Sequence, residues 1–276
     1  MRKILVLVAA VGFLVSCNRS GFTISGETKG FADGTKVYIS KIDDNDLVKI
    51  DSTEITGNAF QFKGEASEIE YSFVQIEEGK DLQPFHIPMI LENGEIKVVA
   101  DKADMASVKV TGTKNNDDLI KFNETAFSIS KEIENFQKEN NDKYQQAAAA
   151  NDMATIESLM AEMETKKNKL IDAGSSFIDA NKNSYVSLIL LAQFGPQMDS
   201  KEFKTKFNNL SKEIKETKIG KEMAEQFKAS DLVEIGQKAP DFKAPDLNGK
   251  EISLYENLGK VTVIDFWASW FGPCRQ

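Results

Sequence analysis

The sequence is short of cysteine and histidine, with two cysteines and one histidine among its 276 residues. Two cysteines exclude a disulfide-stapled scaffold, and so few thiol and imidazole ligands argue against a zinc site. Basic residues are also outnumbered, since 34 Lys and Arg stand against 43 Asp and Glu and leave a net charge of −9. We therefore expect no nucleic-acid partner, because proteins that bind nucleic acid carry a basic surface. No metal or other cofactor is predicted.

A long membrane-spanning run is also missing, but residues 1–17 have the layout of a secretory signal peptide. Two basic residues precede the apolar run Ile4–Val15, which is too short to span a bilayer comfortably. The run leads into Leu-Val-Ser-Cys, which ends at Cys17 and resembles the lipobox of bacterial lipoproteins. The resemblance implies that Cys17 is acylated and becomes the first residue of a lipid-anchored chain facing the periplasm. An ordinary signal peptide is the alternative, and the choice between inner and outer membrane stays open.

The rest of the chain has a globular composition, with 41% hydrophobic and 28% charged residues. Residues 21–113 are predicted to form seven or eight short strands, because apolar and polar residues alternate there between turn residues. The runs are Phe22–Ser25, Lys36–Ser40, Val48–Ile55, Ala59–Lys63, Tyr71–Ile76, Ile87–Leu91, Glu95–Val99 and Val108–Thr111. This pattern favours an antiparallel all-β sandwich or barrel. Asn93-Gly94, between two apolar runs, predicts a hairpin.

Residues 115–231 are predicted to form a helical segment, because apolar residues recur there at helical spacing. The stripes run over Phe122–Phe136, Ile156–Phe177 and Phe203–Ile214, and a more buried helix is expected over Ser184–Phe194. We interpret the stripes as surfaces that pack within the chain. A dimerising coiled coil is the alternative, although the roughly three to four heptads that it needs are not sustained.

Residues 235–276 differ in composition, because the charge-rich helices stop and proline becomes more frequent. Gly236–Phe242 is expected to be extended, and Ile252–Leu254 is predicted to be a short strand. Val261–Trp267 is an apolar run broken by a single acid. Such a run is typical of a central strand that is buried on both faces.

The sequence Trp-Phe-Gly-Pro-Cys, Trp270–Cys274, follows this run directly. A strand that leads through Trp-x-Gly-Pro-Cys into a helix resembles the active site of thioredoxin-fold proteins. Together with Gly236–Phe242 it is most similar to the membrane-anchored TlpA/ResA-type thiol–disulfide oxidoreductases. A β-rich domain of unknown function and a helical segment ahead of the thioredoxin part are also similar to lipoproteins of this type in Bacteroidetes. The resemblance implies a multidomain chain that ends in an α/β thioredoxin-like fold.

In that family, two cysteines separated by two residues at the start of a helix cycle between dithiol and disulfide. The helix N-terminus favours the thiolate of the first cysteine, which attacks a substrate disulfide, and the second cysteine resolves the mixed disulfide. The resemblance assigns Cys274 to the resolving position, Trp270 to an apolar wall, and Gly272 and Pro273 to the turn. It matches Asp265 to the buried acid that assists deprotonation of the resolving thiol. A capping or salt-bridging acid at the strand end is the alternative for Asp265.

The sequence departs from the family pattern at two places. The nucleophile position holds Phe271, which forms no thiolate, so we expect no disulfide reductase turnover from this chain. The remaining thiol of Cys274 is expected to be buried and inert, with slow formation of mixed disulfides as the alternative. The sequence also stops at Gln276, so residues 235–276 are expected to be an incomplete, poorly ordered or aggregation-prone domain from a truncated reading frame.

Two other candidate sites carry little weight. His86 lies between Pro84 and Pro88 with no second histidine or spare cysteine nearby, which disfavours a metal or general-base role. Asp43–Asp46 is similar to part of a calcium loop but lacks the glycine and distal glutamate of that motif. A solvated hairpin tip is the favoured interpretation there.

Two functions from different classes remain. The first is a TlpA/ResA-type oxidoreductase at the cell envelope, with cysteine-containing envelope proteins or a membrane electron donor as partners. The second is a non-enzymatic envelope lipoprotein that acts as a binding module through its β-domain. The motif resemblance favours the first at the level of the family, whereas Phe271 argues against activity in this chain.

Overall fold

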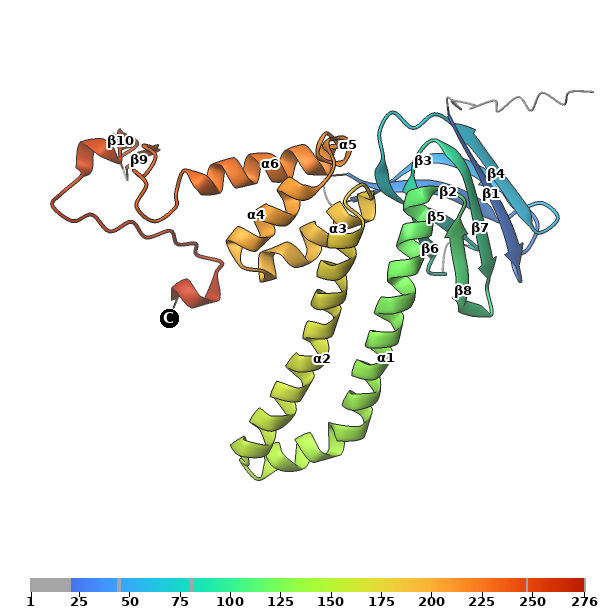
Figure 1. The fold of residues 1–276 in the computed structure, drawn as a ribbon, viewed down its shortest axis with the longest axis horizontal. Coiled ribbons are helices and arrows are strands. Elements are labelled where there is room, and N and C mark those ends of the chain that lie inside the picture. Colours follow the sequence, from blue (N-terminus) through green and yellow to red (C-terminus); the bar gives the residue numbers. More distant parts are fainter. Residues whose placement is uncertain (1–20, 44–45, 80–81, 247, 276) are drawn as a thin grey trace, which may run out of the picture. The chain divides into compact units, whose positions relative to one another are not determined.

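The computed structural model describes residues 21–43, 46–79, 82–246 and 248–275. The chain divides into two compact units, Met1–Lys221 and Glu222–Gln276, and each is described by itself. The first unit contains two β-sheets and most of the helices, and the second contains the C-terminal segment (Figure 1). Residues 1–17, with the predicted lipidation site Cys17, lie outside the described part of the chain.

The eight strands predicted for residues 21–113 are all present, and they form two four-stranded sheets. One sheet has the order β4-β1-β7-β8 and the other has the order β3-β2-β5-β6. The strands are β1 Phe22–Lys29, β2 Lys36–Asp43, β3 Asp46–Glu54, β4 Ala59–Gly64, β5 Glu70–Glu77, β6 Phe85–Leu91, β7 Gly94–Asp101 and β8 Asp104–Thr111.

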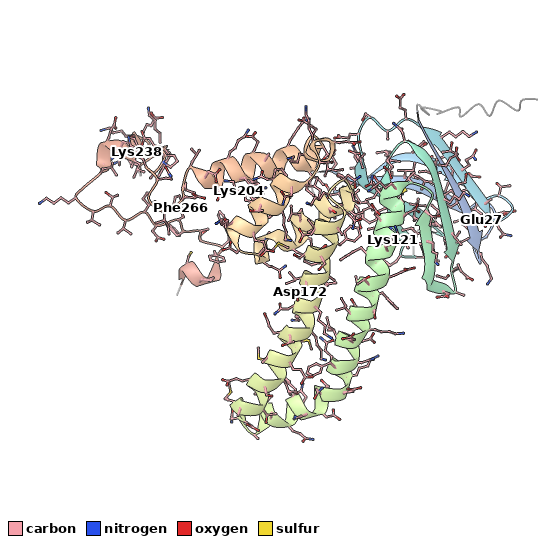
Figure 2. The ribbon with its side chains drawn as sticks, viewed as in Figure 1. Glu27, Lys121, Asp172, Lys204, Lys238 and Phe266 are labelled. Carbon is pink, nitrogen blue, oxygen red and sulfur yellow. The ribbon has the colours of Figure 1, made fainter. Side chains whose placement is uncertain are left out.

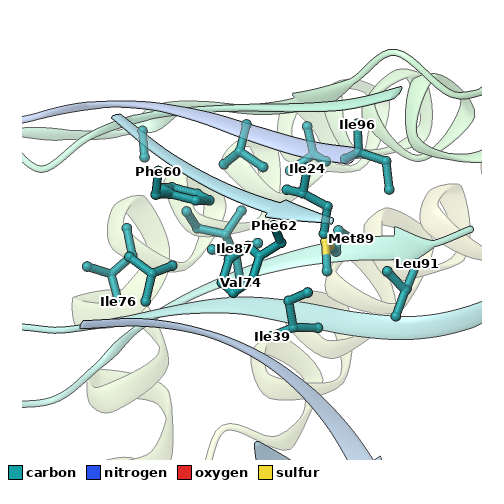
Figure 3. Close-up of a cluster of buried hydrophobic side chains, with 14 of the residues drawn as sticks. Ile24, Ile39, Phe60, Phe62, Val74, Ile76, Ile87, Met89, Leu91 and Ile96 are labelled. Carbon is teal, nitrogen blue, oxygen red and sulfur yellow. The ribbon is translucent and has the colours of Figure 1, made fainter. Parts of the chain in front are cut away.

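The inward faces of the two sheets share one hydrophobic core, so the predicted sandwich is confirmed. Ile24 and Val98 come from one sheet, and Ile39 and Val74 come from the other; all four side chains are fully buried. Figure 3 shows these layers meeting face to face. The period-2 pattern in the sequence therefore marked the buried face of each strand correctly.

The prediction of a hairpin at Asn93-Gly94 is wrong. β6 and β7 belong to different sheets, so the chain crosses from one sheet to the other at this point. The Asn93 side chain binds the backbone of Ala66 through both its oxygen (2.8 Å) and its nitrogen (2.9 Å). The N–H of Gly94 donates to the carbonyl oxygen of Gly21 and starts a parallel pairing of β7 with β1. The sheets are thus antiparallel except for this one pair among the described strands.

The helical segment is also confirmed, with one change in its divisions. Instead of one helix over Phe203–Ile214, the chain breaks at Leu210 and restarts with Ser211 as the N-cap, whose N–H donates to the carbonyl oxygen of Lys182. The helices are α1 Lys114–Ala149, α2 Met153–Ala180, α3 Tyr185–Phe194, the 3₁₀ turn η1 Gly195–Gln197, α4 Ser200–Asn209, α5 Lys212–Lys215 and α6 Lys218–Asp231.

α1 and α2 form a long antiparallel hairpin that packs within the chain at its base. The rings of Phe122 and Phe177 meet edge to face with their centroids 5.7 Å apart. Gly174 of α2 lies against the ring of Phe194 of α3, where any Cβ would come within 2.6 Å of the ring. The glycine therefore lets α3, the most apolar helix, pack closely against the hairpin.

Two adjacent asparagines at the start of α1 join the helices to the sandwich. The Asn116 side chain accepts a hydrogen bond from the N–H of Ile90 (2.9 Å) and donates to the carbonyl oxygen of the same residue (2.8 Å). It thereby takes the place of a neighbouring strand on the free edge of β6. Asn116 is fully buried and also donates to the hydroxyl of Thr113.

Asn115 extends this junction in two directions. Its backbone N–H and its side-chain nitrogen donate to the carboxylate of Glu92, at 3.1 and 2.7 Å. Its side-chain oxygen accepts from the N–H of Tyr185 at 2.7 Å, which satisfies a free backbone donor at the start of α3. Asn115 of α1 thus connects Glu92, which lies where the chain crosses between the sheets, with Tyr185 at the start of α3.

In the second unit, the predicted short strand is present and the predicted central strand is not. β9 Lys243–Pro245 and β10 Glu251–Ser253 form a small antiparallel hairpin, followed by the 3₁₀ turn η2 Tyr255–Asn257. Residues 261–267 have no strand partner among the described residues, and most of their side chains are exposed. The prediction for Val261–Trp267 is therefore wrong, because an apolar run becomes a central strand only when other strands pair with it.

Replacement of Asn116 by alanine is expected to destabilise the first unit by about 2–4 kcal/mol. The change leaves the buried N–H and C=O of Ile90 without partners, and each such group costs on the order of 1–3 kcal/mol. Urea unfolding monitored by circular dichroism measures the effect. Asn123→Ala, on an exposed position of the same helix, is the control. Equal stability of the two variants would contradict the role given to the junction.

Candidate functional site

The segment that leads to the motif is organised around Asp241. Its carboxylate accepts hydrogen bonds from the N–H of Tyr255 at 3.0 Å and from the hydroxyl of Ser253 at 3.0 Å. These bonds, with the Tyr255 N–H first, lower the pKa of Asp241 below its ordinary value. The Tyr255 hydroxyl donates to the carbonyl oxygen of Ala239 at 2.6 Å, and Lys238 lies over the Tyr255 ring.

The sequence analysis identified Gly236–Phe242 as an extended segment. It did not identify Asp241 and Tyr255 as the residues whose hydrogen bonds stabilise that segment. An aspartate next to a proline is a signal for a local side-chain-to-backbone hydrogen bond. The partner, however, lies 14 residues further along the chain. The spacing in the sequence does not indicate such a distant contact.

The motif itself begins with a turn and ends in a single 3₁₀ turn. The N–H of Phe271 donates to the carbonyl oxygen of Ala268 at 3.1 Å, and the N–H of Cys274 donates to that of Phe271 at 3.0 Å. Residues Gly272–Arg275 form the 3₁₀ turn η3. The described residues thus contain one turn at the position where the resemblance places the start of a helix.

The predicted site residues are close in sequence, but the structure does not enclose them. Trp270 is 88% exposed and Phe271 is 55% exposed. The nearest ordered aromatic contact upstream joins Phe266, labelled in Figure 2, to Phe242, with ring centroids 6.4 Å apart. The described residues therefore provide no closed pocket around the motif for a substrate peptide.

Two expectations for the site are corrected. Cys274 is a free and exposed thiol, so the expectation of burial is wrong, and the alternative of slow mixed-disulfide formation stays a prediction. Asp265 is exposed and lies in the unpaired stretch, so it is not the buried acid of the resemblance. Both differences have the same cause. The strand that would bury Asp265 and place Cys274 beneath the sheet surface does not form here.

The other candidates lie far from the motif in sequence. His86 is an exposed residue of β6 beside the ring of Phe73, with ring centroids 6.2 Å apart. Asp43 of β2 lies opposite Asp46 of β3 in the register of the antiparallel pair, which agrees with the predicted hairpin tip. In the part of the chain that the structure describes, no group of three His, Cys, Asp or Glu side chains could hold a metal ion.

A cavity of about 500 Å³ lies between α1 and α2 and contains none of the predicted site residues. Phe136, Tyr144 and Met160 are among the residues that line it. Sequence reasoning missed it, because the same side chains belong to stripes that indicate ordinary helix packing. Leu159 and Phe136 are buried there, whereas Met160 is 61% exposed.

Two family models match separate parts of the chain. Residues 22–119 match the domain of unknown function DUF4369, and residues 235–276 match the AhpC/TSA family. The C-terminal segment is thus similar to thioredoxin-superfamily proteins of the TlpA/ResA type. The predicted resemblance, a β-rich domain of unknown function ahead of a TlpA/ResA-like segment, is thus confirmed.

The relatives match a short stretch of the chain. The thioredoxin-like protein YneN of Bacillus subtilis (strain 168) is 46% identical over 44 residues, which are 16% of this chain and 26% of the relative. The thiol-disulfide oxidoreductase ResA of Bacillus cereus (strain ATCC 10987 / NRS 248) is 40% identical over 50 residues, 18% of this chain and 29% of ResA. The chain thus spans little more than a quarter of the length of these relatives. No solved structure matches it.

The hydrogen bonds of Asp241 predict a pH dependence for the TlpA/ResA-like segment. Because its pKa is lower in the folded segment than in the unfolded chain, ionised Asp241 stabilises the hairpin above its unfolded pKa. This stabilisation is lost as the pH falls through the folded pKa. Amide exchange at Tyr255, followed by NMR between neutral and acidic pH, is expected to show the loss. Asp241→Asn should flatten the dependence, and an unchanged transition in that variant would assign it to another group.

Proposed function

We propose that this protein is a lipid-anchored cell-envelope protein of the TlpA/ResA thiol–disulfide oxidoreductase type, and that this chain does not itself run the dithiol cycle. One observation carries the second half of the proposal. Phe271 stands three residues before Cys274, at the position that the family motif reserves for the nucleophilic cysteine.

The chemistry of the cycle requires two sulfur atoms. The first thiolate attacks a substrate disulfide, forms a mixed disulfide and releases one substrate thiol. The second thiolate then attacks the mixed disulfide, releases the second substrate thiol and leaves the protein with an internal disulfide. The protein dithiol thus supplies the two electrons that reduce the substrate. A chain with Cys274 but no cysteine at position 271 can form the mixed disulfide and cannot resolve it internally.

Exposure of Cys274 supports a role in slow thiol exchange rather than in turnover. The thiol is accessible in the described structure. We propose cysteine-containing envelope proteins or a membrane electron donor as its partners.

Insulin reduction with dithiothreitol as the electron source tests the redox part of the proposal. We expect the protein to reduce insulin no faster than its Cys274→Ser variant, because neither has two thiols within the motif. Addition of a TlpA/ResA-type protein with both cysteines serves as the positive control. Turnover clearly above that of Cys274→Ser would show that a single thiol is sufficient and would overturn the proposed inactivity.

The lipid anchor is proposed from Leu-Val-Ser-Cys ahead of position 18, with the chain facing the periplasm. Among the described residues, no helix is both long and apolar enough to cross a bilayer.

Metabolic labelling with radioactive palmitate in a bacterial host tests the anchor. We expect label in the membrane fraction for the protein and for Cys274→Ser, and none for Cys17→Ser, because the acyl chains are attached to Cys17. Label that persists in Cys17→Ser, or that is absent from the protein itself, would contradict lipidation at this cysteine.

A further inference from the structure

The cavity between α1 and α2 has no part in the redox proposal. The two helices run side by side (Figure 1), and each lines the cavity with residues that share one helix face over two turns. These residues are Gln137, Asn140, Asn141 and Tyr144 in α1 and Met160, Met163, Glu164 and Lys167 in α2. The cavity is thus a groove between two helix faces.

The apolar lining of this groove is only partly buried. Phe136 and Leu159 are 8% and 7% exposed, whereas Tyr144 is 42% and Met160 is 61% exposed. All the lining residues belong to the two helices, so no third element of the described chain closes the groove. Exposed tyrosine and methionine side chains beside an open groove are typical of a surface that another molecule covers.

The two charged residues of the lining have no partner within the described chain. Glu164 and Lys167 are exposed and lie three residues apart on α2, a spacing at which opposite charges can pair on one helix. They form no ion pair, whereas the adjacent Lys166 pairs with Glu162. Both charges therefore stay available to a molecule that covers the groove.

The outer stripe of α2, which we define as Met160, Glu164, Lys167 and Ile171, is symmetric about its own centre. These residues recur every three or four positions and lie on one helix face. The charged pair and the apolar pair have the same midpoint, Thr165–Lys166. If two copies of α2 pack antiparallel about this point, each Glu164 faces a Lys167 and each Met160 faces an Ile171.

This symmetry favours a second copy of the chain over other occupants. A two-fold axis brings the same surface of both copies together and makes every contact twice. The outer stripe has one acid and one base, so it has no charge preference for an acidic or a basic ligand. Ile171 is half-buried in the single chain, which leaves apolar surface for Met160 of another copy to cover.

We propose that the α1–α2 hairpin binds the same face of a second copy of this chain, with the two α2 helices antiparallel about a two-fold axis at Thr165–Lys166. Glu164 pairs with Lys167 of the second copy, and Met160 packs against Ile171 of the second copy. The contact extends over about three helical turns. This proposal rests on neither the redox motif nor the lipid anchor, so it can fail or hold independently of both.

Sedimentation equilibrium of the full-length protein in density-matched detergent tests the dimer. We expect a monomer–dimer equilibrium that shifts toward dimer as the protein concentration rises to about 0.1 mM. Glu164→Lys is expected to raise the dissociation constant at least about tenfold, because it places lysine opposite lysine at both charge pairs. Glu124→Lys, an exposed position of α1 outside the groove with the same change in net charge, should leave it unchanged.

A charge swap separates the proposed pairing from damage to the fold. Lys167→Glu alone should weaken the dimer as Glu164→Lys does. Glu164→Lys/Lys167→Glu should restore it, because the two charges only exchange places across the axis. An equal mixture of the two single variants should form a dimer with one chain of each. Failure of both the double variant and the mixture to restore the dimer would overturn the proposal.

Met160→Gln tests the apolar part of the contact and is expected to weaken the dimer several-fold. A protein that stays monomeric throughout the concentration range, or equal effects of Glu164→Lys and Glu124→Lys, would overturn the proposal. The dye 1-anilinonaphthalene-8-sulfonate distinguishes a different occupant. Binding of this dye to a monomeric protein, with loss of binding in Met160→Gln, would assign the groove to a small apolar ligand instead.

Discussion

The paired asparagines at the start of α1 are the interaction on which the first unit depends. A sheet edge leaves backbone groups without partners, and a helix start leaves four N–H groups without partners. Asn116 satisfies the edge of β6, and Asn115 supplies an acceptor for the start of α3 while it holds Glu92. These neighbouring side chains thereby fix the direction in which the long helical hairpin leaves the sandwich.

The C-terminal segment illustrates the opposite situation, in which a strong local pattern has no tertiary partner. Residues 261–267 are apolar and β-branched at several positions, yet they are exposed and unpaired in the described structure. Nearby, the hairpin around Asp241 is ordered because its hydrogen bonds are short-range and polar. The difference follows from the physics of the two kinds of interaction. A capped turn is complete within about fifteen residues, whereas a central strand needs neighbours from elsewhere in the chain.

The proposed lack of dithiol turnover rests on Phe271. The flanking residues of the motif, Trp270, Gly272 and Pro273, match the pattern of the similar redox proteins, in which the cycle depends on two thiols. Among the described residues of the segment, Cys274 supplies an exposed thiol.

The sequence by itself determined the eight strands, the helical segment and the identity of the TlpA/ResA-like motif. All three depend on local information: period-2 and period-3.6 patterns, and a run of consecutive residues. Only the tertiary structure decided that Asn93-Gly94 crosses between sheets, that β1 and β7 are parallel, and that Cys274 and Asp265 are exposed. It also decided that the hydroxyl of Ser72 is buried without a hydrogen-bond partner in the described structure. These features depend on partners distant in the chain, and no local pattern records where such partners lie.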